Sequence, residues 1–131
     1  MTLWKMTIAA AGSALALAAC GNSSGGGGGA SACNPTGGSS SGTGTKVVKV
    51  VSDPSTVGKY DPNPISVSVG QSVEWDFNDN SAPHTVTAED MSFDSCSQTA
   101  GAKFVVTFNK AGDFKYHCTL HAQMLGNVKV S

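Results

Sequence analysis

Three side chains that can donate electron pairs to a soft metal ion lie three residues apart near the end of the chain. The segment "HCTLHAQM" contains them as Cys118, His121 and Met124. A thiolate, an imidazole and a thioether all suit soft or borderline metal ions. Because positions i and i+3 approach each other in a tight turn, the three side chains can converge on one point. A chance arrangement in a buried turn would leave this regular spacing unexplained.

His84 is the candidate for a fourth ligand, because it follows Pro83 at the start of a predicted strand. Two imidazoles and one thiolate in a trigonal set, with a weak axial thioether, are the ligands of blue-copper electron-transfer sites. Zinc competes, since thiolate and imidazole also suit it, but it gains little from Met124. We therefore predict a site for one copper ion that alternates between Cu(I) and Cu(II), with the ligands His84, Cys118, His121 and Met124.

Two further residues with donor atoms are not predicted to bind the metal. His117 neighbours Cys118, but successive side chains of a strand point to opposite faces, so we interpret it as a surface histidine. Met91 lies in a polar segment, and we interpret it as a packing residue.

Short alternating segments, with no helical periodicity, make up the chain after residue 44. The predicted strands are residues 46–51, 65–69, 72–77, 84–88, 103–108, 114–118 and 126–131. Many short strands separated by turn residues are typical of an all-β, antiparallel sandwich or barrel. The strand aromatics are predicted to form its core: Trp75, Phe77, Phe104, Phe108, Phe114 and Tyr116.

Two segments between these strands are predicted to be loops. Pro54, Pro62 and Pro64 are placed in the loop after the first strand, where they cost no ladder hydrogen bonds. Residues 89–101 are polar and irregular, and we predict a loop that crosses one edge of the sandwich.

The N-terminal residues 1–19 have the features of a secretory signal peptide, because the apolar run that ends at Ala19 is too short to span a bilayer permanently. The run closes with "LAACG", which resembles the bacterial lipobox. This resemblance implies cleavage before Cys20 and lipidation of that residue. We expect an exported protein, anchored by lipid to a bacterial membrane and facing the periplasm or the cell exterior. The alternative is a plain signal peptide with an accidental cysteine.

Residues 20–44 are rich in glycine and serine, which predicts a flexible linker before a single domain of residues 45–131. Cys33 and Cys96 remain once Cys20 and Cys118 have been assigned. Two leftover cysteines in an exported protein suggest a disulfide. Spacing alone does not show that two cysteines are close, so a disulfide and two free thiols both stay open.

Two longer segments resemble the cupredoxin (blue-copper) family. "YHCTLHAQMLGNVKV" resembles the copper loop of the amicyanin- and plastocyanin-like members of that family, and its Cys-x2-His-x2-Met spacing most resembles the short loop of amicyanin. "YDPNPISVSVGQSVEWDFNDNSAPHTVT" is similar to the run that ends in the first histidine ligand. The resemblance implies a Greek-key β-sandwich with copper at one end, and it assigns the ligand roles to His84, Cys118, His121 and Met124.

The predicted function is the transfer of single electrons between extracytoplasmic redox proteins. We expect a monomer that docks transiently through an apolar patch around His121, made of Ala82, Pro83, Leu120, Ala122 and Leu125. Transient redox interfaces of this kind are small. Nucleic acid is not an expected partner, because the 8 Lys and Arg residues against 9 Asp and Glu residues form no basic cluster.

Three other classes of function fit the sequence less well. A copper oxidase or nitrite reductase needs a second copper site built mainly of histidines, and two of the 3 histidines here are already assigned; we therefore expect no enzymatic activity. A copper-delivery or storage protein is the main alternative, although such proteins need exchangeable, exposed ligands. A metal-free interaction module would leave the Cys-His-Met spacing unexplained.

Overall fold

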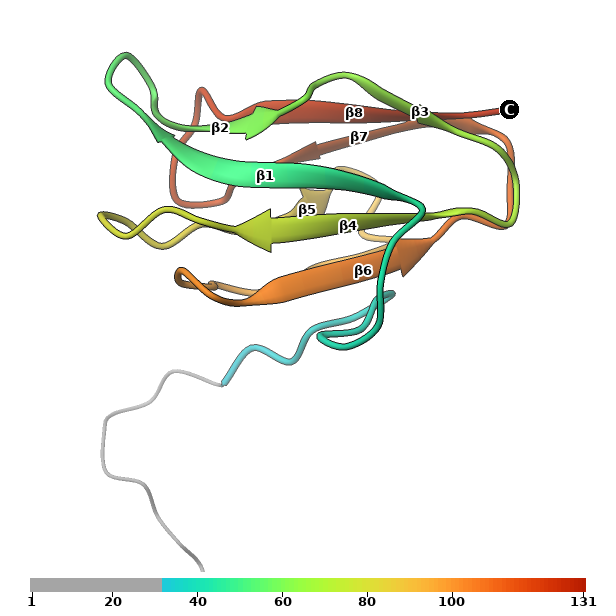
Figure 1. Ribbon diagram of the computed structural model, residues 1–131, viewed down its shortest axis with the longest axis horizontal. Coiled ribbons are helices and arrows are strands. Elements are labelled where there is room, and N and C mark those ends of the chain that lie inside the picture. The colour runs from blue at the N-terminus through green and yellow to red at the C-terminus, as the bar shows by residue number, and fades with distance from the viewer. Residues whose placement is uncertain (1–31) are drawn as a thin grey trace, which may run out of the picture. The chain divides into compact units, whose positions relative to one another are not determined.

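The computed structural model describes residues 32–131, which form two facing four-stranded sheets (Figure 1). The first sheet has the order β2-β1-β4-β6, with β1 Lys46–Asp53, β2 Val57–Asp61, β4 Ser72–Phe77 and β6 Lys103–Thr107. The second has the order β3-β8-β7-β5, with β3 Ile65–Val67, β5 Thr87–Ala88, β7 Gly112–His117 and β8 Leu125–Val130. The predicted signal peptide and Cys20 lie outside the described residues. Within residues 32–131, no helix has the length and apolar character needed to cross a membrane.

The predicted β-sandwich is confirmed, with two differences. The pairings β1–β4 and β3–β8 are parallel, so the two sheets are mixed rather than purely antiparallel. Residues 57–61 were predicted to be part of a loop, but they form β2 and pair with β1. The prediction was wrong because the flanking prolines hid a short alternating pattern in which Gly58 and Tyr60 face inward.

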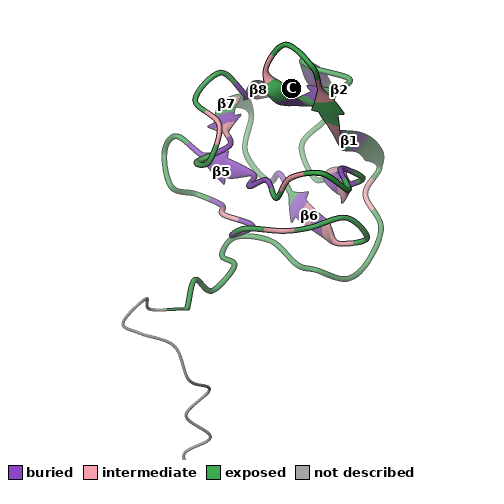
Figure 2. Ribbon diagram, turned by 90° about the vertical axis from the view of Figure 1, so that its left-hand side faces the viewer, coloured by how far each residue is buried: buried purple, intermediate pink, exposed green. Residues whose placement is uncertain are grey.

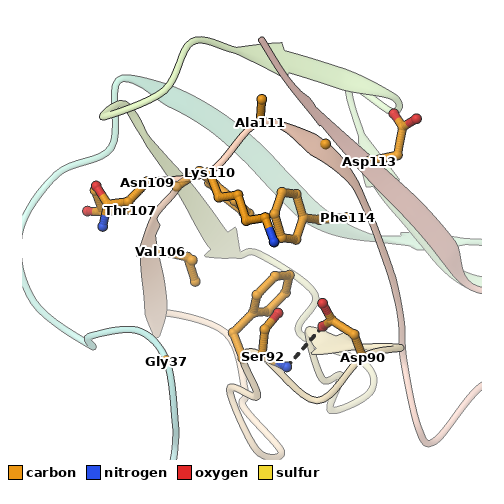
Figure 3. Close-up of a pocket in the computed structure, with 13 residues that line it drawn as sticks. Gly37, Asp90, Ser92, Val106, Thr107, Asn109, Lys110, Ala111, Asp113 and Phe114 are labelled. Carbon is orange, nitrogen blue, oxygen red and sulfur yellow. Dashed lines mark hydrogen bonds between the residues drawn. The ribbon is translucent and has the colours of Figure 1, made fainter.

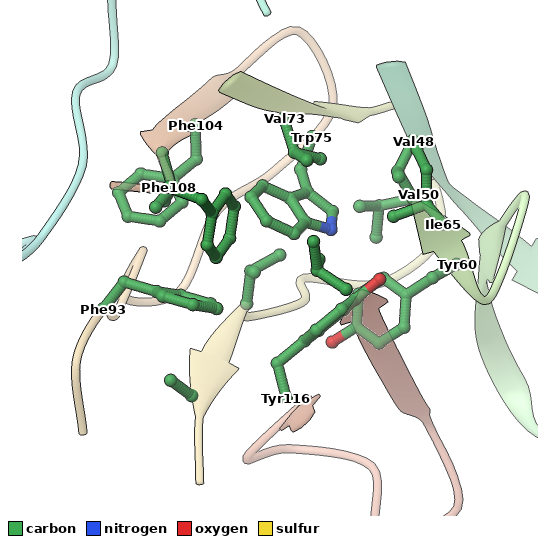
Figure 4. Close-up of a cluster of buried hydrophobic side chains, with 14 of the residues drawn as sticks. Val48, Val50, Tyr60, Ile65, Val73, Trp75, Phe93, Phe104, Phe108 and Tyr116 are labelled. Atoms are coloured by element: carbon green, nitrogen blue, oxygen red, sulfur yellow. The ribbon is translucent and has the colours of Figure 1, made fainter. Parts of the chain in front are cut away.

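The core lies between the two sheets and is built largely from aromatic rings (Figure 4). The indole of Trp75 lies at its centre, with ring centroids 5.2 Å from Tyr116 and 5.7 Å from Phe93. The predicted core aromatics are confirmed as buried, except that Phe114 is only partly buried. Phe93 was not predicted, because it belongs to the segment 89–101, which is a loop as expected but inserts this ring between the sheets.

The described part of the predicted linker, residues 32–44, is hydrogen bonded to the domain. The backbone of Thr36 exchanges two hydrogen bonds of 2.9 Å with Asp94. Ser39 makes a similar pair, both of 2.8 Å, with Val105 on β6. This segment therefore adds to the edge of the first sheet.

Cys33 and Cys96 are joined in a disulfide, with their Cα atoms 5.8 Å apart. The bond attaches the segment 32–44 to the loop 89–101. Asp94 lies beside the two sulfur atoms, but sulfurs bonded to each other offer no thiolate to a metal ion.

Three connections meet at one end of the sandwich, on the left in Figure 1 and facing the viewer in Figure 2. They are the turn between β1 and β2, the loop that leaves β4, and the loop between β7 and β8. The loop after β4 carries His84, and the loop after β7 carries Cys118, His121 and Met124. The fold therefore brings the predicted ligands to the same end.

Candidate metal centre

The donor atoms of His84, Cys118 and His121 converge on one point. The two Nδ1 atoms are 3.1 Å apart, and the Cys118 Sγ lies 3.5 Å from the His121 Nδ1 and 3.9 Å from the His84 Nδ1. Metal–nitrogen bonds of about 2.0 Å and a metal–sulfur bond of about 2.3 Å would separate trigonal ligand atoms by roughly 3.5–3.8 Å. The three residues therefore fit a single metal ion without rearrangement of the backbone.

Met124 returns to Cys118 because two backbone hydrogen bonds close the loop between them. The Met124 N–H donates to the His121 carbonyl at 3.0 Å, and the Cys118 N–H donates to the Met124 carbonyl at 3.0 Å. Both sulfur-containing side chains are buried in the core cluster. The structure therefore confirms that the three-residue spacing places a cysteine, a histidine and a methionine in one turn.

The Cys118 sulfur accepts a hydrogen bond of 3.3 Å from the backbone N–H of Thr85, the residue after the first histidine. The Thr85 hydroxyl accepts a second bond, of 2.9 Å, from the N–H of Thr119. These bonds tie the two ligand loops together. The bond from Thr85 also fixes the position of the sulfur atom relative to His84.

His84 is buried, and its second ring nitrogen is held by a residue that the sequence analysis missed. The Nε2 atom lies 2.7 Å from a carboxylate oxygen of Asp79, and both side chains are at most 2% exposed. The hydrogen bond from His84, followed by those from Ser81, holds the pKa of Asp79 well below its usual range despite its burial. The only sequence signal was an acidic residue five positions before the histidine, within a polar loop.

Gly58 on β2 lies against the face of the same imidazole. A Cβ atom added at Gly58 would come within 3.0 Å of both ring nitrogens of His84 and closer still to the Cε1 between them. Only glycine leaves room for the ring at this position. Asp79 and Gly58 therefore confine His84 from two sides.

His121 is the one of the three donor residues that is only half-buried. Its Nδ1 faces the site, and no described residue forms a hydrogen bond with its Nε2. Four predicted docking residues are exposed: Leu120 at 50%, Leu125 at 59%, Pro83 and Ala122. Ala82 is partly buried.

The two other donor residues lie outside the cluster of ligands. His117 is half-buried on β7 and is not among the converging donor atoms. The interpretation of Met91 as a packing residue is wrong, because its side chain is 72% exposed in a turn where its φ is +64°.

A separate pocket of about 540 Å³ lies between the loop from β6 to β7 and residues 90–93 (Figure 3). Phe93 and Phe114 contribute apolar walls, and the carboxylate of Asp90 accepts a hydrogen bond of 3.0 Å from the Ser92 N–H. Its lining contains none of the four predicted ligands and no buried polar side chain. We therefore assign no ligand to it.

Residues 46–131 match the sequence profile of the copper-binding proteins of the plastocyanin/azurin family. The chain belongs to this family. Cupredoxins bind one copper ion and carry electrons, so the His-Cys-His-Met group is the copper site of an electron carrier.

Solved structures of other cupredoxins are similar to this chain. A purple cupredoxin from Nitrosopumilus maritimus is 28% identical, with a TM-score of 0.55; the match covers 63% of this chain and 98% of that one. An amicyanin variant in its Cu(I) form is 29% identical, with a TM-score of 0.55; the match covers 70% of this chain and 86% of that one.

Proposed function

We propose that this cupredoxin shuttles single electrons between extracytoplasmic redox proteins. The observation that supports this most is the closed site, in which three donor atoms lie within 4.8 Å of one another and only His121 of the three residues approaches the surface. Copper, when bound, supplies the one-electron chemistry by alternating between Cu(I) and Cu(II). Such a site keeps its ion and exchanges electrons.

The residues of the chain hold the ligands in one arrangement. Thr85 fixes the sulfur of Cys118, and Asp79 fixes the imidazole of His84. Rigid support of this kind limits how far ligands can move when the charge of the site changes. The electron would then pass through the half-buried ring of His121.

The exposed apolar residues around His121 are the proposed docking surface for the redox partners. The mutation Leu125→Glu should slow electron self-exchange between the Cu(I) and Cu(II) forms of the full chain, because two such faces must meet and each would carry a new charge. The visible spectrum should not change. Val69→Glu is the matched control, since Val69 is 49% exposed and bonds to Ser131 at the other end of the sandwich. Equal self-exchange rates in both variants would contradict this surface.

Copper delivery or storage is the second candidate function. The buried ligands of the site weigh against this function, because delivery requires that the copper ion be exchanged. The deciding experiment is a visible spectrum of the full chain after Cu(II) is added. An intense thiolate-to-copper charge-transfer band that ascorbate bleaches would support electron transfer. Tight binding of Cu(I) or zinc without that band would favour delivery.

We also propose that the protein is exported and anchored to a membrane through Cys20. The lipobox-like segment before this residue supports the anchor, and the Cys33–Cys96 disulfide supports an oxidising compartment. In a bacterial host, Cys20→Ser should move the chain from the membrane fraction to the soluble fraction. A variant that stays in the membrane fraction would contradict the lipid anchor.

A further inference from the structure

The two histidines of the site differ in what supports them. The Nδ1 of each faces Cys118, but only the Nε2 of His84 has a partner among the described residues, the carboxylate of Asp79 at 2.7 Å. This partner lies in the same loop and is as deeply buried as the histidine. Neither residue has access to water that could replace their bond.

The carboxylate is itself held in place. The backbone N–H of Ser81 donates to the Asp79 Oδ1 at 2.7 Å, and the Ser81 hydroxyl donates to the same oxygen. The second oxygen, Oδ2, is therefore directed at His84. An ionised carboxylate only accepts hydrogen bonds, so the Nε2 of His84 must carry a proton, and in the neutral ring the Nδ1 then presents its lone pair to the metal.

We propose that Asp79 is a positioning residue that fixes the tautomer of His84 and lowers the reduction potential of the bound copper. A carboxylate behind a ligating imidazole makes the ring a stronger donor and adds negative charge near the metal. Both effects favour Cu(II) over Cu(I), because Cu(II) carries the larger positive charge. The effect on the reduction potential rests on the proposed function, whereas the assignment of the His84 tautomer does not.

The tautomer is tested without copper. Nitrogen-15 NMR of the metal-free full chain should show His84 with a protonated Nε2 and an unprotonated Nδ1. A neutral His84 ring with its proton on Nδ1 instead of Nε2 would overturn the positioning role, whether or not the chain carries electrons. This measurement uses the unmodified protein and so does not depend on whether a variant folds.

The potential is tested with Asp79→Asn, whose amide oxygen can still accept the His84 proton but carries no charge. Loss of such a partner commonly changes metal affinity by about tenfold or more. If Cu(II) loses tenfold more affinity than Cu(I), the reduction potential rises by about 59 mV. Asp61→Asn is the matched control, because it removes an exposed carboxylate of β2.

The expected result is a rise in the reduction potential for Asp79→Asn alone, with the blue charge-transfer band retained. An unchanged potential, or an equal rise in both variants, would overturn the specific role of Asp79. Ser81→Ala provides a milder change, since it removes the hydroxyl bond to Oδ1 but leaves the charged carboxylate in place; its reduction potential should change by less than that of Asp79→Asn. Absence of the blue band in the unmodified chain would instead refute the proposed function.

Discussion

The contact between Gly58 and His84 leads to a strong prediction, because a single methyl group should displace a metal ligand. In Gly58→Ala, the new Cβ would overlap the Cε1 of the imidazole. Gly58 is buried on β2 and paired with Ser52 of β1, so the pairing limits how far its backbone can retreat. The ring cannot simply turn aside, because its Nε2 is bonded to the buried Asp79.

The size of the displacement follows from the geometry. The new carbon would lie 2.3 Å from the Cε1, so the ring must move by about 0.7 Å to reach 3.0 Å, the shortest separation that Cβ atoms ordinarily show. Metal–ligand distances tolerate deviations of only about 0.2 Å. Overpacking of a buried site also costs about 1–3 kcal/mol. Gly58→Ala should therefore lower both the copper affinity and the stability of the metal-free protein.

The assay pairs a copper titration, followed by the thiolate-to-copper band, with urea unfolding of the metal-free chain. Gly44→Ala is the matched control, because its added Cβ would meet the backbone of Glu74 on β4 and no metal ligand. The control should lose stability and keep its copper affinity. If Gly58→Ala bound copper as tightly as the unmodified chain and with the same spectrum, the reasoning that Gly58 makes room for His84 would be refuted.

Three other perturbations test the fold. Replacing Cys33 and Cys96 by serine should lower the free energy of unfolding by about 2–4 kcal/mol, since the disulfide spans 63 residues; alkylation of Cys33 and Cys96 in the unmodified chain without reductant would contradict the bond. The hydrogen bond from Lys103 lowers the pKa of Glu74, so this carboxylate stabilises the fold above its unfolded pKa and the stabilisation is lost as pH falls through the lower, folded pKa. Glu74→Gln should flatten the acid side of the stability curve in urea unfolding at a series of pH values. Val57→Gly should raise thermal stability by about 0.5–1 kcal/mol, because a β-branched residue at a φ of +70° is strained, and an unchanged melting temperature would contradict this.

The sequence could predict the ligands because three of them lie in one short turn. Cys118, His121 and Met124 are brought together by local backbone geometry, and that geometry leaves a regular spacing in the sequence. The strands were predictable for a similar reason, because alternation is a property of neighbouring residues. His84 was found through the chemistry of the other three, which required one more imidazole.

The residues that the sequence could not identify act across the fold. Gly58 leaves room for the imidazole of His84 because it has no side chain, and no pattern in the neighbouring sequence indicates this role. Asp79 resembles any acidic residue of a polar loop until its burial is known. Phe93 lies in a polar segment, and only the packing of the loop against Trp75 shows that its ring belongs to the core.

Thr85 explains how such dispersed residues make one site. Its carbonyl accepts a hydrogen bond of 2.5 Å from the hydroxyl of Tyr60 on β2, its N–H donates to the sulfur of Cys118, and its hydroxyl accepts from the N–H of Thr119. One residue thereby joins a strand of the first sheet to both ligand loops. None of these bonds requires a metal ion, so the site is assembled by the fold before copper binds. A cupredoxin built in this way can change its charge by one electron while its protein ligands stay where the two sheets hold them.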